Sequence, residues 1–183
     1  MAPLVTYSRF TESAANPKLY YHGRSSQRGA YHGTYLYLTD CLEYAAGYAE
    51  GQREVYSFTL RFAESRIFSL TNARHRAKVA PLIDPYALTQ AVEVSRTDDG
   101  LLGELDWASL SYLSNDDYEE PEELLQSVGF KAIRLRERPY ANSVLVFEQA
   151  DAEFRGMVDL RTSDQVKRLR DWDAYIRTKW NHL

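Results

Sequence analysis

The chain has 183 residues, 44% hydrophobic and 26% charged, a balance typical of folded globular proteins that excludes an intrinsically disordered chain. The formal net charge of -4 excludes a protein that attracts nucleic acid through its overall charge, although a local basic patch could still bind it. The single cysteine, Cys41, excludes an intrachain disulfide framework and a cysteine-rich zinc site, and it favours a reducing compartment such as the cytoplasm.

No segment of the chain suggests targeting to or insertion in a membrane. Residues 1–23 contain no apolar run of the length found in signal peptides, roughly 7–15 residues. No apolar run approaches the roughly 20 residues that cross a bilayer. No repeat, linker or low-complexity tract divides the sequence, and its length suits one domain with a sizeable core. We therefore expect a single α+β domain over residues 1–183, without a membrane partner.

The N-terminal third of the chain combines strand patterns with one helix pattern. Alternating apolar and strand-forming side chains predict three strands, at residues 19–22, 34–39 and 54–62. Asp40 offers an N-cap, and Glu43, three residues later, completes a capping box for a helix over 41–50.

Residues 64–118 give the weakest pattern. We expect two short helices in this part of the chain, over 73–83 and 105–113, separated by a turn at 96–100.

The next segment begins with a clear helix signal. Acidic residues and Pro121 at the first helical position predict a helix that ends at Gly129. Apolar runs then predict strands over 130–135 and 143–148, with a turn at 137–142 between them.

The last predicted element is an amphipathic helix over 164–180. Its apolar side chains recur every three or four residues and therefore share one face: Val166, Leu169, Trp172 and Ile176.

Several kinds of site are excluded by their missing motifs. The four histidines are scattered, and no HxxxH or CxxC spacing occurs, so we expect no metal site. The chain also lacks a GxGxxG turn, a Walker lysine loop and a GxSxG elbow. These absences argue against a dinucleotide-binding sheet, a P-loop and a hydrolase nucleophile elbow.

The unusual feature of the composition is its 14 tyrosines. Tyr44 and Tyr48 are one helical turn apart on the helix expected over 41–50, so they share a face. Aromatic faces of this kind either pack in the core or form the walls of a pocket for a flat, cationic ring.

Four short motifs resemble the ADP-ribosyltransferase superfamily. They are a strand ending in "YYHG", the strand "TYLYLTD" with a helix tyrosine eleven residues after Tyr37, and the later segments "LLQSVGFKAIRL" and "NSVLVFEQA". Their order resembles the H-Y branch, which includes the poly-ADP-ribose polymerases and small bacterial and phage toxins. The resemblance covers about residues 20–62 and 124–150 and implies split antiparallel β-sheets with peripheral helices.

The resemblance implies NAD as co-substrate, with no metal. His22 would contact the adenosine ribose, the backbone of Gly23 would pair with the nicotinamide carboxamide, and Tyr48 would stack on the nicotinamide ring. The further NAD-binding candidates lie on the same segments: Arg24, Tyr37, Thr39 and Tyr44. The alternative for His22 is a structural histidine, and for Tyr44 a core position.

The chain departs from the family at its catalytic position. Ser143 stands where the family usually has a glutamate, and a serine can hold a ribose hydroxyl but supplies no charge. The nearest carboxylate is Glu137, eight residues after Gly129 in the expected turn, similar to an acidic loop residue of small phage relatives. Glu137 and Ser143 are therefore the candidate catalytic residues. The alternative for Glu137 is a solvated ion pair with its neighbouring arginines.

The implied function is mono-ADP-ribosylation of a macromolecule, either protein or nucleic acid, by a toxin or by a phage-defence or counter-defence effector. An antitoxin or immunity protein is a further candidate partner. Two alternatives stay open. One is an NAD glycohydrolase or phosphorylase toxin of the RES type, and the other is an inactive module that binds NAD.

Overall fold

A computed structural model describes residues 18–24, 35–49, 54–97, 99–106, 109–114, 120–138 and 141–158. The helix expected over 164–180 lies outside these residues. The described part confirms the α+β class, because one mixed sheet of seven strands is accompanied by four α-helices.

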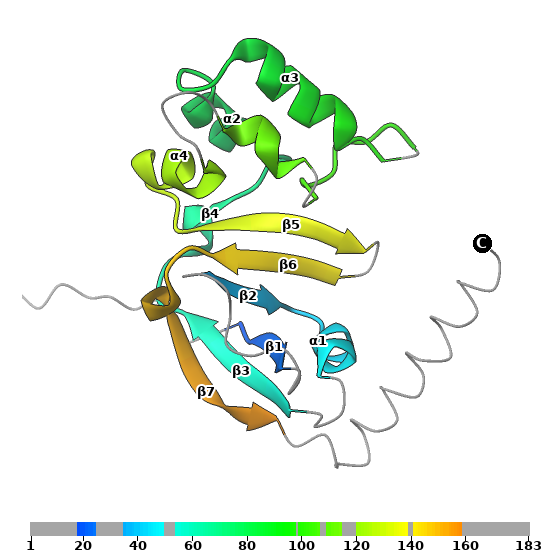
Figure 1. Cartoon of the computed structure of the whole chain (residues 1–183), viewed down its shortest axis with the longest axis vertical. Coiled ribbons are helices and arrows are strands. Elements are labelled where there is room, and N and C mark those ends of the chain that lie inside the picture. The colour runs from blue at the N-terminus through cyan, green and yellow to red at the C-terminus, as the bar shows by residue number, and fades with distance from the viewer. Residues whose placement is uncertain are drawn as a thin grey trace, which may run out of the picture.

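The sheet has the strand order β4-β5-β6-β2-β1-β3-β7 (Figure 1). Its strands are β1 (Tyr20–Arg24), β2 (Leu36–Thr39), β3 (Glu54–Leu60), β4 (Ile67–Phe68), β5 (Ala132–Arg138), β6 (Ala141–Val146) and β7 (Ala152–Val158). Every neighbouring pair is antiparallel except β4 and β5, which are parallel. The sheet is therefore mixed, and not purely antiparallel as the resemblance implies.

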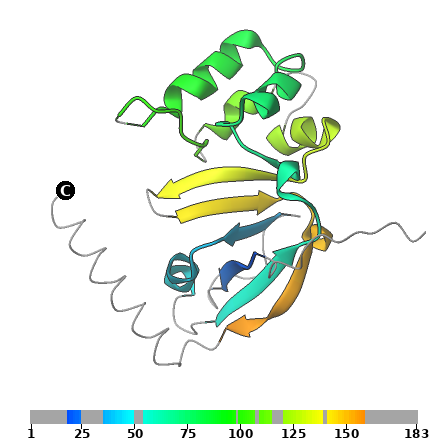
Figure 2. The ribbon, with the colours of Figure 1, turned by 180° about the vertical axis from the view of Figure 1, so that it is seen from behind.

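Three of the four helices form one group, and the fourth lies apart from them. They are α1 (Leu42–Tyr48), α2 (Ala73–Val79), α3 (Pro85–Val94) and α4 (Pro121–Ser127). Helices α2, α3 and α4 gather beyond β5, while α1 lies beside β1 and β3, as both views show (Figures 1 and 2). Within the described residues, none of the helices is long and apolar enough to cross a membrane.

The largest core cluster joins α2, α3 and α4 to β4, β5 and β6. Its fully buried side chains include Phe68, Leu70, Val79, Leu105, Leu113, Leu124, Leu125, Ile133 and Leu135. Burial of such a side chain contributes roughly 1.5–3 kcal/mol. A second cluster lies on the opposite face of β2 and β6, around Leu38 and Val144, and a third joins α1 to Val55 of β3. Strands β1, β3 and β7 contribute no described side chain to the largest cluster and are therefore held by the two smaller ones.

Several expected elements differ from those in the structure. The helix expected over 105–113 is present only as a 3-10 turn at Leu110–Leu113, and the helix expected over 73–83 ends at Val79. Helix α3 and strands β4 and β7 were not expected. Gly129 does end α4 as predicted, with a φ of 87° that only glycine adopts easily.

Candidate active site

Strands β1 and β2 share one registered residue pair in the described part of the sheet. β1 pairs with β3 along all five of its residues. With β2, by contrast, the described part of β1 has a single registered pair, Tyr21 with Thr39. Thr39 also pairs with Ser143 of β6, which pairs in turn with Leu135 of β5. The two parts of the sheet, β4-β5-β6-β2 and β1-β3-β7, therefore meet at Thr39, at a place that we call the strand junction.

His22 reaches across the strand junction. The side chain is buried, and its Nδ1 lies 2.7 Å from the main-chain carbonyl oxygen of Tyr37 on β2. A carbonyl oxygen only accepts hydrogen bonds, so Nδ1 carries the hydrogen, and Nε2 carries the lone pair while the ring is neutral. This contact determines both the orientation and the tautomer of the imidazole. Gly23 and Arg24 follow on β1, paired with β3, and the side chain of Arg24 lies outside the described atoms.

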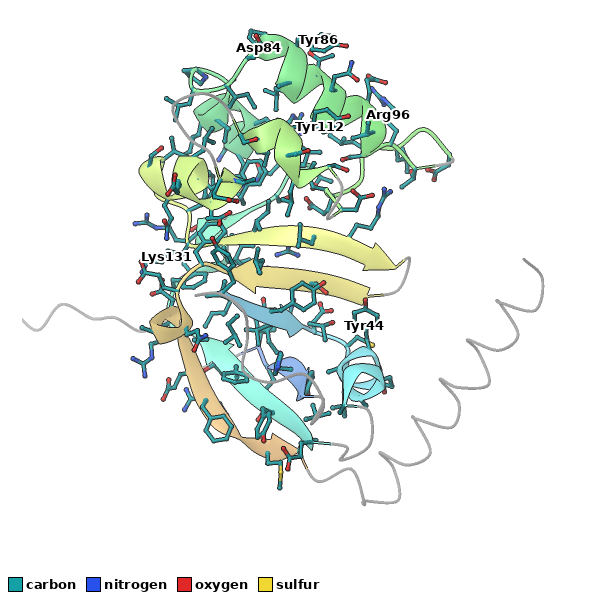
Figure 3. All side chains as sticks on the ribbon, in the orientation of Figure 1. Tyr44, Asp84, Tyr86, Arg96, Tyr112 and Lys131 are labelled. Atoms are coloured by element: carbon teal, nitrogen blue, oxygen red, sulfur yellow. The ribbon has the colours of Figure 1, made fainter. Side chains whose placement is uncertain are left out.

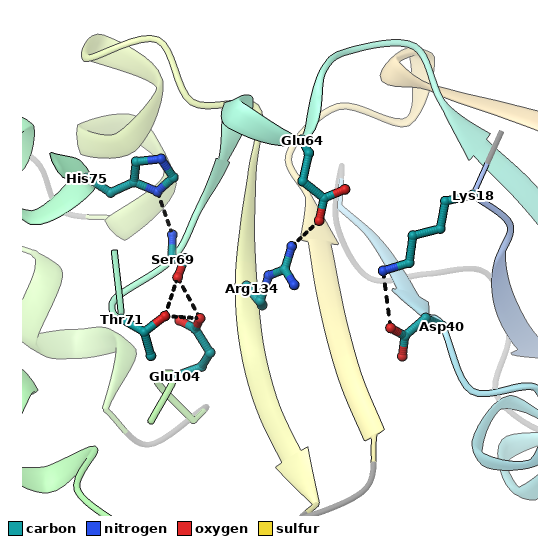
Figure 4. Close-up of polar contacts among 8 residues, drawn as sticks. All are labelled: Lys18, Asp40, Glu64, Ser69, Thr71, His75, Glu104 and Arg134. Carbon is teal, nitrogen blue, oxygen red and sulfur yellow. Dashed lines mark hydrogen bonds and ion pairs between the residues drawn. The ribbon is translucent and has the colours of Figure 1, made fainter. Parts of the chain in front are cut away.

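Polar contacts connect the strand junction to the segments that precede β1 and follow β2. The Thr39 hydroxyl accepts a hydrogen bond of 3.2 Å from the Cys41 amide at the start of α1. Lys18, ahead of β1, forms a 3.2 Å ion pair with Asp40, directly after β2 (Figure 4). Asp40, which we expected to be the N-cap of α1, lies one residue ahead of the N-cap position. Cys41 occupies that position without a side-chain cap bond, so the predicted capping box with Glu43 is wrong.

Cys41 is the only sulfhydryl in the chain, and it lies beside the candidate site. Burial raises the pKa of its thiol, with a smaller contribution from the Glu43 carboxylate. The thiol is therefore held in its protonated form, which is a poor nucleophile.

The tyrosines predicted to bind NAD differ in their burial and in the elements that they pack against. Tyr37 is half-buried and its ring packs against the largest core cluster, so its carbonyl faces His22 while its ring belongs to the core. Tyr44 is 8% exposed and lies on α1 at the end of the sheet where β5 ends and β6 begins (Figure 3). Tyr48 is the last residue of α1, and its side chain lies outside the described atoms.

Ser143 lies in the row of residues that crosses the strand junction. Its side chain is fully buried, and its hydroxyl has no hydrogen-bond partner among the described residues. A substrate can contact this hydroxyl only if neighbouring groups move. The structure thus places Ser143 beside Thr39, as the strand pairing requires, but beneath the surface.

Glu137 lies in strand β5 and not in the turn that we expected. The pairing of β5 with β6 continues through Arg136 with Asn142 and ends with Arg138 opposite Ala141. Two residue steps on β5 therefore oppose one step on β6, so Glu137 is the extra residue of a β-bulge. Its backbone is two residues beyond Leu135, the partner of Ser143, a distance of about 7 Å along the strand. The Glu137 side chain lies outside the described atoms.

The structure also places one residue at the strand junction that the sequence motifs did not single out, Tyr21. Tyr21 is half-buried, pairs with Thr39 and packs against the α1 cluster. The two-residue period of a strand already placed it on the face opposite His22.

A second polar cluster surrounds Glu104 (Figure 4). Its carboxylate accepts hydrogen bonds from the Ser69 and Thr71 hydroxyls, at 2.6 and 2.9 Å, and from the Leu70 amide at 2.8 Å. The Ser69 amide donates to Nδ1 of His75 at 3.1 Å. These bonds connect the segment after β4 to α2 and to the chain ahead of Leu105, so the cluster organises the helical end of the molecule.

One open pocket of about 730 Å³ lies away from the strand junction. Tyr35 and Phe147 line it together with Glu122, Glu123 and Gln126 of α4. These aromatic residues flank the end of the β2–β6 pair opposite Thr39 and Ser143, so this pocket is separate from the candidate site. The described residues contain no group of three or more histidine, cysteine, aspartate or glutamate side chains that could hold a metal ion.

The chain was also compared with known proteins. No family model, curated protein or solved structure matches it.

Proposed function

We propose that the chain is an NAD-dependent ADP-ribosyltransferase that binds NAD at the strand junction and modifies a macromolecule. The observation that carries this proposal is the hydrogen bond from His22 to the Tyr37 carbonyl. It fixes the orientation of an imidazole whose Nε2 accepts a hydrogen bond when the ring is neutral, one residue before Gly23, at the place where two parts of a sheet meet. A ribose hydroxyl is a natural donor to such a nitrogen.

The groups around the strand junction suit the parts of NAD. Gly23 has no side chain to keep a carboxamide away from its backbone. Thr39 supplies a hydroxyl, and Tyr44 and Tyr48 of α1 supply aromatic rings that suit a cationic nicotinamide. Tyr44 is almost fully buried, so stacking on its face requires α1 or its neighbours to shift. We assign Tyr37 to this site through its carbonyl and not through its ring.

In the proposed reaction, the bond between the nicotinamide nitrogen and the ribose breaks, and its electron pair leaves with nicotinamide. Positive charge then builds on the ribose, and a nucleophilic oxygen or nitrogen of the acceptor forms the new bond to the same carbon while losing its proton. A carboxylate near the ribose stabilises this transition state more than it stabilises the substrate, and that difference accelerates the reaction.

Glu137 is the carboxylate that we assign to this role. The bulge places its backbone about 7 Å along β5 from the residue that pairs with Ser143, the position of the family glutamate. Bulges re-aim side chains and are common beside active sites. Ser143 is fully buried and uncharged, so we give it no direct part in stabilising the ribose cation.

NAD carrying a radioactive label in its adenylate part tests this proposal. The purified protein is incubated with the labelled NAD and a cell extract, and the products are treated with protease or nuclease. We expect label on a polymer, and the sensitivity of that label assigns the acceptor to protein or nucleic acid. Free ADP-ribose would instead identify a glycohydrolase, and ADP-ribose phosphate would identify a phosphorylase.

A second candidate is an NAD-binding module without catalysis. It is favoured by one observation: the strand position of the family glutamate holds a buried serine. Calorimetry with NAD and the turnover assay distinguish the two, since the module binds NAD and releases no nicotinamide.

A further inference from the structure

An exposed apolar surface covers the β3–β7 pair. Phe154 and Met157 of β7 are 57% and 65% exposed. The Phe154 ring lies 5.7 Å from that of Phe58 and 5.9 Å from that of Tyr56, measured between centroids. Phe154 pairs with Phe58, and Met157 pairs with Tyr56, so all four side chains share one face. We call this group, Tyr56, Phe58, Phe154 and Met157, the ribbon surface.

A β-bulge is what places both exposed side chains on this face. Residues three apart in a regular strand point to opposite faces, as Phe154 and Met157 otherwise would. The register of β7 shifts between the partners Ser57 and Phe58, and Gly156 adopts a φ of 141° at this point. The extra residue brings Met157 to the side of Phe154. β7 is also the last strand of the sheet, so no described strand lies beyond it.

The chain that follows β7 carries an apolar stripe suited to this surface. The sequence predicts an amphipathic helix over 164–180 with Val166, Leu169, Trp172 and Ile176 on one face. A helix of that length spans about 26 Å, and the seven residues of β7 span about 23 Å. Eight residue steps from Val158 to Val166 reach up to about 26 Å, so a return over β7 is within reach.

We propose that the ribbon surface is the docking site for segment 164–180 of the same chain. The occupant covers Phe154 and Met157 with its own apolar stripe, and the short connection after Val158 makes the contact intramolecular, so docking does not depend on protein concentration. This inference is independent of the proposed NAD chemistry.

Hydrogen exchange of the full chain, measured by mass spectrometry, tests the docking. We expect the amides of 164–180 to be protected in the unaltered protein. In the Phe154→Asp/Met157→Asp variant we expect them to exchange faster by about tenfold or more, because a charged surface no longer holds the helix. Tyr86→Asp is the matched control, since Tyr86 is 71% exposed on α3 and belongs to another surface (Figure 3).

A second measurement leaves the sheet unaltered. Peroxide oxidation of Met157 can be followed by the mass of the peptide that contains it, with free methionine added to both samples as the reference. We expect slow oxidation of Met157 in the unaltered protein and fast oxidation in Leu169→Asp/Trp172→Asp. Equal oxidation in both proteins, or unprotected amides over 164–180, overturns the proposal. Protection that grows with protein concentration also overturns it and assigns the surface to a second copy.

Discussion

Glu137 is the side chain on which the proposed chemistry depends most. Glu137→Gln keeps the size of the side chain and removes its charge, so it should slow release of nicotinamide by about 10²–10³-fold. NAD affinity should persist, because the carboxylate acts on charge that develops only in the transition state. Nicotinamide release and calorimetry with NAD measure the two quantities separately.

Ser143→Ala is the control for this prediction. The Ser143 hydroxyl is fully buried without a described hydrogen-bond partner, so its removal should change the rate by about tenfold at most, the value of one neutral hydrogen bond. A glutamine variant with full activity, combined with an inactive alanine variant, would transfer the catalytic role from Glu137 to Ser143.

His75 should make the stability of the protein depend on pH. Its Nδ1 accepts from the Ser69 amide, and burial, assisted by Lys78, lowers its pKa below the ordinary value. The histidine of the unfolded chain therefore binds its proton at a higher pH than His75 of the folded protein does. Stability should be full above the ordinary histidine pKa of about 6.5, and it should fall as the pH decreases from there toward the lowered pKa.

Urea midpoints measured between about pH 7.5 and 5 check this effect. His75→Gln removes the titrating group and should flatten the curve in this window. The difference between the two proteins isolates the contribution of His75 and is therefore the quantity to compare. Identical pH dependence in both would show that His75 does not contribute.

At the site, the sequence predicted the arrangement along the chain better than the direction of each side chain. The strands predicted at 19–22 and 34–39 are present as β1 and β2, and they carry His22 and Thr39. Alternation alone does not say which face of a strand becomes core, and Tyr37 directs its ring to the core. The bulge at Glu137 was also beyond prediction, because its signal lies in the partner strand and not in the local sequence.

Among the elements, the segment around Glu104 connects parts of the chain that are distant in sequence. Glu104→Gln replaces a carboxylate oxygen with an NH₂ group, which cannot accept from the Leu70 amide or from both hydroxyls. We expect a loss of about 1–3 kcal/mol in the free energy of unfolding, since partly buried bonds to a charged group are lost. Urea denaturation of the two proteins measures the difference.

Glu93→Gln provides the comparison for Glu104. Glu93 is about half exposed and pairs with Arg96 at 3.2 Å on the surface of α3. An exposed ion pair of this kind contributes about 0–1 kcal/mol. If both substitutions cost the same, the Glu104 cluster does not hold the helical end as we describe.

The helix and the two strands that were not predicted were missed for different physical reasons. Helix α3 starts with Asp84, whose carboxylate accepts from the Tyr86 amide at 2.6 Å, followed by Pro85 at the first position. This signal is as strong as the one at Pro121, and it was available in the sequence. β4 has only two residues, and β7 carries a bulge that breaks its alternation, so periodicity could not reveal either strand.

The whole molecule should open in two steps because of the strand junction. The β4-β5-β6-β2 part shares the largest core cluster with α2, α3 and α4, whereas β1, β3 and β7 rely on smaller clusters and meet β2 at a single described pair. We expect native-state hydrogen exchange at low denaturant to give lower opening free energies for β1, β3 and β7 than for β5 and β6. Exchange of all strands through one common opening would contradict this division.

The bulge in β5 has a consequence for how such a protein changes over generations. Because the extra residue falls after Leu135, the inward alternation of Ile133 and Leu135 does not depend on what occupies positions 136–138. Selection can therefore exchange the residue at the tip of the strand without repacking the interior. A library in which the codons of residues 136–138 are randomised should therefore consist mostly of variants that still fold. In such a library, changes in the proposed activity can be measured apart from loss of folding.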